Sequence, residues 1–182
     1  KSLGFFACGI VQATPVDAET AAAVRQWISK GSQATMDYMA NYTEKRLNPC
    51  LLVPGTKTIV SLAMNYAPAK TMAATEYQLA AYAYGQDYHD VMKTKLRQLA
   101  TIFVDTAPVL ERYWAQKAGL GWIGKNHQLI IPKAGSMFFL GEIFLPYEFD
   151  SYDVPMPNRC GRCKRCINAC PTCAICEGKN FE

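Results

Sequence analysis

The first 150 residues alternate between strand-like apolar runs and amphipathic stretches. Continuous apolar or β-branched runs between turn residues predict buried strands, whereas apolar positions recurring with the helical period predict helices. We expect strands at residues 3–12, 56–66 and 101–105, and a hairpin of residues 128–131 and 137–145 around 133–135. We expect helices at residues 14–30, 76–84, 88–100 and 108–118, and a short helical piece near 36–39. Interleaved strands and helices predict an α/β or α+β domain over residues 1–150.

Capping residues indicate where the first helix begins and ends. Thr14 and Pro15 have the chemistry of an N-cap followed by the first helical position. Gly31 is a natural residue to follow the last turn. We therefore expect Thr14 to cap this helix.

The residues after 150 have a different character. Pro155 and Pro157 predict a linker within residues 152–157. Six of the eight cysteines then follow within residues 160–176. Clustering at metal-ligand spacing, rather than spread along the chain, favours a reducing compartment and hence the cytoplasm. Cys8 and Cys50 stand alone and are expected to be buried small apolar residues.

The cysteine spacing is the strongest chemical signal in the chain. The pattern C-x2-C-x2-C-x3-C-P is typical of a 4Fe–4S cluster. Zinc is the competing interpretation, although zinc sites usually separate their two cysteine pairs by a longer spacer. The run comprises Cys160, Cys163, Cys166 and Cys170, and Pro171 follows it.

Only two further cysteines follow, so a second run is incomplete. In two-cluster ferredoxins the fourth cysteine of such a run ligates the other cluster. Cys173 and Cys176 can form the first half of a second run that lacks its final Cys-Pro.

Charge and hydropathy narrow the possible partners. The net charge is +4. Most of the excess adjoins the cysteines, where it either compensates an anionic cluster or faces phosphate groups of a nucleic acid. No apolar run approaches the ~20 residues that span a bilayer, so we expect no membrane segment. The N-terminus, which starts at Lys1, shows no signal peptide. The basic residues concerned are Arg159, Arg162, Lys164 and Arg165.

Asp105 ends an expected strand just before a helix. Ligands bind at such positions in α/β sheets. Asp105 or Thr106 can equally cap the helix that begins near Pro108, and composition alone favours the cap. In that interpretation Glu111 and Arg112 have no special role.

A glycine-rich segment at residues 119–124 precedes Lys125 and Asn126. It matches neither a P-loop nor a dinucleotide fingerprint. Its glycines either let a large flat ligand approach the backbone or make a tight connection, and the sequence leaves both open. Asp87 and His89 place a carboxylate and an imidazole between two expected helices, where a histidine is usually structural.

The order of these motifs resembles the tRNA epoxyqueuosine reductases over essentially the whole chain. The motifs are GFFACG at 4–9, YTEKRLNP at 42–49, YGQDYH at 84–89, DTAPVLER at 105–112 and AGLGWIGKN at 118–126, followed by the cysteine run. The resemblance implies a cobalamin-dependent iron–sulfur oxidoreductase, related to reductive dehalogenases, that reduces epoxyqueuosine to queuosine in tRNA. It implies a base-off cobalamin domain akin to flavin-reductase and cobalamin-processing folds at residues 1–150. A ferredoxin-like domain, incomplete here, would occupy 151–182 and deliver electrons to cobalt from two 4Fe–4S clusters.

The same resemblance suggests roles for individual residues. Asp105 becomes the proton donor to the epoxide oxygen, which reverses the preference for a cap. Cys160, Cys163 and Cys166 would ligate one cluster and Cys170 the second, with Cys173 and Cys176 as further ligands. The implied partners are the anticodon region of tRNA and an external electron donor. The resemblance further implies that the protein is a cytoplasmic monomer. Expected cobalamin contacts are Arg46, Asp87, His89, Asp105, Lys125, Asn126, Leu129, Ile130 and Ile131.

Some positions depart from the family pattern. His127 stands where threonine is expected, and the connection between residues 100 and 101 is unusually short. Cys173 can also stand in for a glycine that follows the first run in the family. We hypothesise that residues are missing from the sequence at 100–101 and after 172. Two other functions remain open: a reductive dehalogenase-like enzyme acting on a small molecule, and a non-catalytic iron–sulfur or zinc module.

Overall fold

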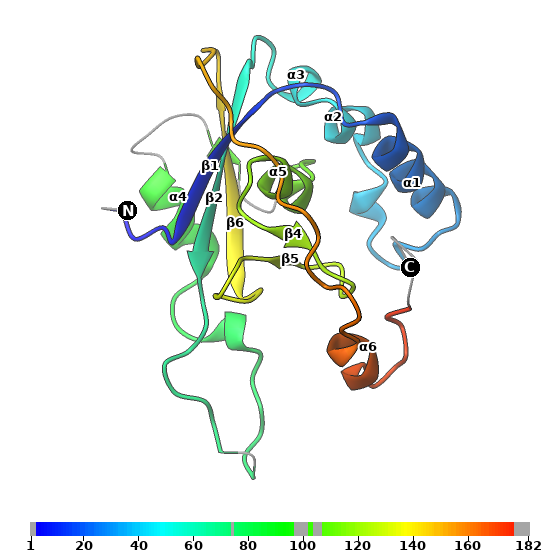
Figure 1. The fold of residues 1–182 in the computed structure, drawn as a ribbon, viewed down its shortest axis with the longest axis vertical. Coiled ribbons are helices and arrows are strands. Elements are labelled where there is room, and N and C mark those ends of the chain that lie inside the picture. Colours follow the sequence, from blue (N-terminus) through cyan, green and yellow to red (C-terminus); the bar gives the residue numbers. More distant parts are fainter. Residues whose placement is uncertain (1–2, 74, 97–101, 104–106, 177–182) are drawn as a thin grey trace.

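The fold is an antiparallel sheet covered by helices on both faces, followed by an extended segment and a small helical end (Figure 1). The computed structural model describes residues 3–73, 75–96, 102–103 and 107–176. Asp105 and the connection at 100–101 therefore lie outside the described residues. None of the helices in these ranges is long and apolar enough to cross a membrane.

The main sheet has four strands in the order β1-β2-β6-β3, and every neighbouring pair is antiparallel. In this sheet Ile59 lies opposite Phe144, and Phe103 lies opposite Glu142. Antiparallel pairing makes the domain α+β in arrangement. The strands are β1 (Ala7–Gln12), β2 (Thr58–Asn65), β6 (Phe138–Leu145) and β3 (Ile102–Phe103).

The expected hairpin of residues 128–131 and 137–145 is wrong. β5 (Leu129–Ile130) pairs instead with β4 (Trp122–Ile123) in a separate two-stranded sheet. One isolated bridge, between Ile131 and Gly135, marks the turn where the hairpin was expected. β6 is then free to enter the centre of the main sheet beside β2.

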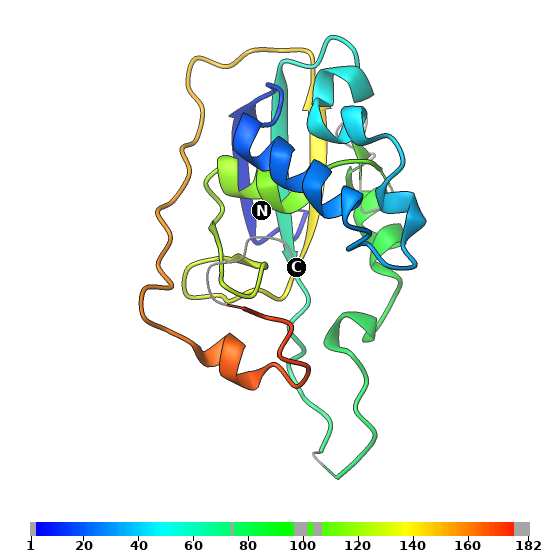
Figure 2. The ribbon, with the colours of Figure 1, turned by 90° about the vertical axis from the view of Figure 1, so that its right-hand side faces the viewer.

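Helices cover the two faces of the sheet. α4 (Tyr88–Leu96) lies on one face, and α5 (Glu111–Lys117) lies on the other beneath α1 (Ala18–Ser29) (Figures 1 and 2). α2 (Thr43–Leu47) and α3 (Pro49–Leu52) connect α1 to β2, and α6 (Arg165–Ala169) lies near the C-terminal end. Short 3₁₀ turns occur at Asp37–Met39 and Ala81–Ala83.

Alternation along β2 explains how one strand serves both faces. Ile59 packs with Trp114 of α5 and Phe144. Leu62, on the opposite side, packs with Met92 and Leu96 of α4. Ala63 lies on the α5 side with Ala115 and Ala118, where small side chains allow α5 to approach the sheet closely.

Two helix predictions need correction. Asp17, not Thr14, is the N-cap of α1, and its carboxylate accepts a 2.9 Å hydrogen bond from the Thr20 N–H. Residues 76–84 contain only a 3₁₀ turn, because no face of this segment is buried: Tyr77 is 97% and Leu79 62% exposed. Without tertiary packing a helix this short is unstable in water.

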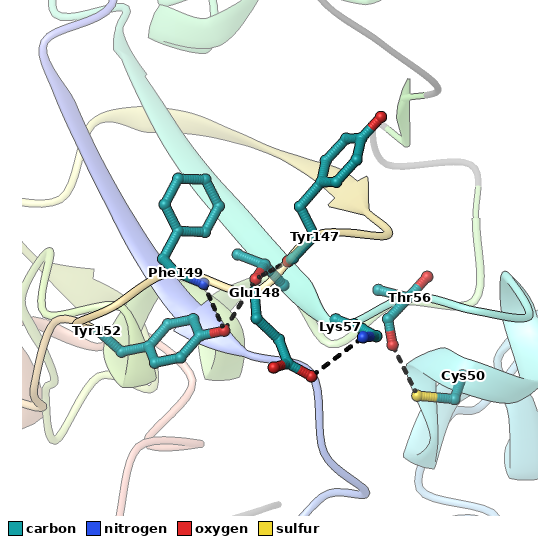
Figure 3. A network of polar contacts seen from close by, with 8 residues as sticks. Cys50, Thr56, Lys57, Tyr147, Glu148, Phe149 and Tyr152 are labelled. Atoms are coloured by element: carbon teal, nitrogen blue, oxygen red, sulfur yellow. Dashed lines mark hydrogen bonds and ion pairs between the residues drawn. The ribbon is translucent and has the colours of Figure 1, made fainter.

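The expected linker has no regular secondary structure, but the domain holds it firmly. We call residues 147–160 the strap; Figure 2 shows it running along the sheet towards α6. Thr58 Oγ1 donates to the Tyr147 carbonyl at 2.6 Å and lies 3.1 Å from the Tyr152 hydroxyl. Figure 3 shows that the Tyr152 hydroxyl also accepts a hydrogen bond from the Phe149 N–H. In the same view the Lys57 ammonium forms an ion pair with the Glu148 carboxylate, at 3.2 Å.

The strap next reaches the open edge of the sheet. The Asp153 N–H donates to the Ile10 carbonyl at 3.0 Å. The Ile10 N–H in turn donates to the Asp153 carboxylate at 2.8 Å. The strap thus pairs with β1 on the side that faces away from β2.

Candidate functional site

A cavity of about 350 Å³ opens beside β6 and the first turn of α5. Aromatic rings form much of its wall. Tyr88 stacks on Phe139 with centroids 3.9 Å apart and planes within 3°. Tyr66 packs against the same Phe139 ring at 4.5 Å. Tyr82, 57% exposed, lies at the rim. Such walls suit a flat or partly apolar ligand.

Glu111 and Arg112 give the cavity a charged side. Arg112 donates to the backbone carbonyl of His127, which ties α5 to the β4–β5 loop. Burial lowers the pKa of the Arg112 guanidinium, and Glu111 partly opposes that effect. An arginine remains protonated under such a shift. Glu111 and Arg112 thus line the cavity as well as forming the first turn of α5.

Arg46 is not among the described residues that line the cavity, but it is near enough to Glu111 for their charges to interact. It is 7% exposed, and its Nε has no hydrogen-bond partner among the described residues. Burial lowers its pKa, while the charges of Tyr38 and Glu111 act in the opposite direction. A buried guanidinium with an unused donor is available to an anionic or carbonyl group of a ligand.

Of the three residues expected after the glycine-rich loop, Leu129 lines the cavity. Ile131 is buried in the core with Ala63 and Leu120, and Ile130 is half-buried. Lys125 and Asn126 are not among the described residues that line the cavity. Asn126 instead accepts a 3.2 Å hydrogen bond from the Gln128 N–H within the loop.

The glycines of this loop serve the packing of the chain. A Cβ at Gly121 would lie 2.2 Å from the Ile130 carbonyl oxygen. A Cβ at Gly124 would lie 2.5 Å from the Ile130 Cδ1. The contact at Gly121 is with backbone and leaves no room for a side chain, whereas the contact at Gly124 is with the end of a side chain. The structure therefore favours the tight connection over close approach of a ligand.

Asp87 and His89 bind each other next to the cavity. The carboxylate accepts from the His89 N–H and contacts its ring Nδ1, both at 2.9 Å. The backbone bond is the main reason that the pKa of Asp87 is lowered. The His89 ring lies 4.0 Å from the ring of Tyr88, which lines the cavity. Asp87 itself faces a second hollow with Asp90 and Lys95.

The sequence interpretation missed a buried polar pair beneath α5. Glu142 of β6 and Ser61 of β2 are both fully buried, and the Ser61 hydroxyl donates to the Glu142 carboxylate at 3.3 Å. Phe103, two residues before Asp105, lies opposite Glu142 in the sheet. The signal was present: Glu142 is the lone charge within an apolar strand.

The cysteines lie on and around α6. The Cys163 N–H donates to the Cys160 carbonyl at 2.9 Å, and the Trp122 indole Nε1 lies 3.4 Å from the Cys160 sulfur. Hydrogen bonds from the Thr172 side chain and then the Ile175 N–H lower the pKa of Cys170 to about 7. Such donors favour thiolates, the form that binds iron or zinc.

The cysteine thiols of residues 160–176 are suitable ligands for iron or zinc, but their sulfur atoms do not lie together around one point. Among residues 3–73, 75–96, 102–103 and 107–176, no three His, Cys, Asp or Glu side chains lie close enough together to hold a metal ion. Away from this segment, Cys8 is exposed, so its expected burial is wrong, and Cys50 is half-buried.

Comparison with known proteins gives one consistent family. A family model described as epoxyqueuosine reductase QueG, DUF1730, matches residues 46–114. Epoxyqueuosine reductases from Cellulophaga algicola and Leadbetterella byssophila are 43% and 45% identical, and each alignment covers 95% of this chain. It covers only 60% and 61% of those proteins. The alignments span 185 residues, so these relatives contain residues with no counterpart in this chain of 182.

Solved structures agree with the sequence match. An epoxyqueuosine reductase from Streptococcus thermophilus matches with a TM-score of 0.85 and 29% identity, over 96% of this chain and 51% of that one. Another epoxyqueuosine reductase, solved with a tRNA-Tyr epoxyqueuosine-modified stem loop, matches with a TM-score of 0.80 and 30% identity. The match covers 96% of this chain and 50% of that one. The Bacillus subtilis enzyme, solved with a catalytic aspartate loop swung out of its active site, matches with a TM-score of 0.78 and 29% identity. This match covers 96% of this chain and 50% of that one.

Proposed function

We propose that the chain belongs to the epoxyqueuosine reductase family and is the part of such an enzyme that reduces epoxyqueuosine to queuosine in tRNA. The sequence match over 95% of the chain carries the proposal. A relative solved with a modified tRNA stem loop supports the anticodon region of tRNA as the partner. The chain spans about three fifths of the length of its curated relatives.

We assign the chemistry to two units, residues 1–150 and 151–182. The aromatic and charged cavity beside α5, lined by Arg112 and Leu129, is where the first unit would hold the face of a cobalamin. The buried Arg46 would be a further contact. A whole corrin is larger than 350 Å³ and would extend through the open side of the cavity. When bound, cobalamin supplies a cobalt that reduces the epoxide carbon, and iron–sulfur clusters supply its electrons.

Asp105 is the proton donor in this proposal. Reduction of an epoxide to an alkene and water takes two electrons and two protons. Asp105 would give the first proton to the oxygen as the epoxide opens, and solvent would supply the second before that oxygen leaves as water. Asp105 lies six positions before Glu111, whose side chain lines the cavity. The carboxyl group would need to be protonated when the substrate binds, which exclusion of water favours.

Substitution of Asp105 tests this role. In anaerobically reconstituted full-length protein, we expect Asp105→Asn to reduce epoxyqueuosine in tRNA at least about a hundredfold more slowly, the usual range for loss of a general acid. The exposed Asp37→Asn is the matched control and should retain the wild-type rate. Equal turnover in the Asp105 variant and the wild type would remove Asp105 from the mechanism.

Cobalamin binding is tested separately. The UV-visible spectrum of the wild-type protein after incubation with cobalamin and gel filtration should show corrin bands. Arg112→Ala should retain less corrin, because the variant loses both the cavity charge and the bond to the His127 carbonyl. A wild-type protein that elutes without corrin contradicts the cobalamin assignment.

A further inference from the structure

The end of the strap is bound to β4 through Asn158. The Asn158 side-chain amide donates to the Ile123 carbonyl at 3.1 Å. Its oxygen accepts the Cys160 N–H at 2.8 Å. One side chain therefore uses both of its polar atoms to join β4 to the backbone of Cys160.

The neighbouring residue on β4 contacts the sulfur of the same cysteine. The Trp122 indole Nε1 lies 3.4 Å from the Cys160 Sγ. Indole nitrogen is a donor only, so the sulfur accepts the hydrogen bond. Both side chains are half-buried, which shields this bond from competing water.

β4 is a firm base for these contacts. β4 pairs with β5, and the lack of a side chain at Gly121 lets the two strands approach closely at Ile130. Arg112 ties the loop between them to α5. Because the Trp122 indole and the Ile123 carbonyl both belong to this packed element, they hold the cysteine in one place and do not follow its motion.

We infer that Trp122 and Asn158 are positioning residues for the metal-binding segment: they anchor Cys160 to the catalytic domain, and Trp122 adds an N–H···S hydrogen bond to a cluster ligand. The inference rests on the proposed iron–sulfur role of Cys160. A hydrogen bond to a ligand sulfur stabilises the additional negative charge of a reduced cluster, so it raises the reduction potential. Electron transfer into the domain would then begin from a cluster held at a set place and potential.

The variant Trp122→Phe removes the N–H and keeps an aromatic ring. In the full-length protein reconstituted anaerobically, we expect unchanged iron and sulfide content and a more negative midpoint potential in a spectroscopic redox titration. Trp27→Phe is the matched control, because Trp27 is a half-buried tryptophan on α1, and it should keep the wild-type potential. An unchanged potential in Trp122→Phe at full iron content overturns the tuning role.

The anchoring role has a readout that needs no cluster. Asn158→Ala should speed hydrogen exchange of the Cys160 amide about fivefold, as loss of one ~1 kcal/mol hydrogen bond predicts. Exchange at the wild-type rate overturns the anchor. A wild-type protein that takes up no iron refutes the proposed function instead, and the exchange measurement still decides whether Asn158 holds the strap.

Discussion

Asp17 shows how a single residue can connect two helices. Its carboxylate caps α1 through the Thr20 N–H. It also accepts a 3.0 Å hydrogen bond from the Tyr113 hydroxyl of α5 and lies 3.5 Å from the Lys117 ammonium. Burial, together with the Asp17 charge, raises the pKa of Tyr113 to about 12. Tyr113 therefore remains a donor across the physiological range.

Asp17→Ala should lower the free energy of unfolding by about 1 kcal/mol at pH 7, the usual cost of a lost N-cap. The Thr20 N–H bond is the main reason that the pKa of Asp17 is below its ordinary 3.8. Because the pKa of Asp17 is lower in the folded protein, the ionised carboxylate stabilises the fold at pH values above 3.8. This stabilisation is lost as the pH falls below 3.8 and the carboxylate becomes protonated. Urea unfolding of both proteins should therefore show the full difference at pH 7 and a smaller one below pH 3.8. The exposed Asp150→Ala should show neither effect. A difference that stays constant with pH would contradict the assignment.

The sequence could predict a cap near this position but not which residue provides it. Thr14 and Pro15 have suitable local chemistry. The Val16 N–H, however, donates to the Leu47 carbonyl at 2.8 Å, which keeps the chain outside the helix for longer. The choice of Asp17 depends on Tyr113, which is distant in sequence. Similarly, the order of the sequence motifs indicated Asp105 as a site residue. That Arg112 lines a cavity could be seen only in the folded structure.

At the scale of elements, the two-stranded sheet β4–β5 depends on glycine. The Cβ that Gly121 lacks would lie 2.2 Å from the Ile130 carbonyl oxygen, which is backbone and cannot rotate away. At Gly135, in contrast, a Cβ would meet no atom within 4 Å, although its φ of +81° is strained for other residues. The two glycines are therefore needed for different physical reasons.

Gly121→Ala should destabilise the protein by about 3 kcal/mol or more, because the strands must separate to admit the methyl group. Gly135→Ala should cost only about 1 kcal/mol, from left-handed backbone strain. Thermal unfolding of the two variants beside the wild type checks the order. Equal losses would contradict the crowding at Gly121, because its backbone lies outside the left-handed region and adds no strain of its own.

Periodicity located most elements and failed where pairing partners decide the outcome. The buried strand β2 was visible as an apolar run, and the helix α5 as a stretch that ends before Gly119. The run at 128–131 was also visible, but its partner is β4, because the glycines at 121 and 124 allow that pairing. Residues 76–84 have a helix-forming composition, which predicted a helix. The helix does not form because the segment has no buried face.

At the scale of the whole molecule, the strap joins three parts of the fold. It contacts the start of β2 at Thr58, the edge of the sheet at Ile10, and β4 at Ile123. The prolines that suggested a linker are therefore part of an attached segment. Its course places the cysteines beside the domain and not on a free tether.

Asp153→Ala should release the middle of the strap. The Ile10 amide loses its 2.8 Å acceptor, so its hydrogen exchange should accelerate about fivefold, as expected for one lost hydrogen bond of ~1 kcal/mol. Limited proteolysis should also cut within residues 147–158 earlier. Asp150→Ala, an exposed acid in the same strap, is the matched control. Unchanged exchange at Ile10 would show that the contact adds no stability.

The contact between Asp153 and Ile10 has a consequence for the behaviour of many molecules together. β1 is the outer strand of the main sheet, and an outer strand offers unpaired N–H and C=O groups to any passing chain. The strap occupies the groups of Ile10 at the middle of that strand. It also carries prolines, which cannot extend a ladder. The segment that leads to the cysteines thereby protects the protein against edge-to-edge aggregation.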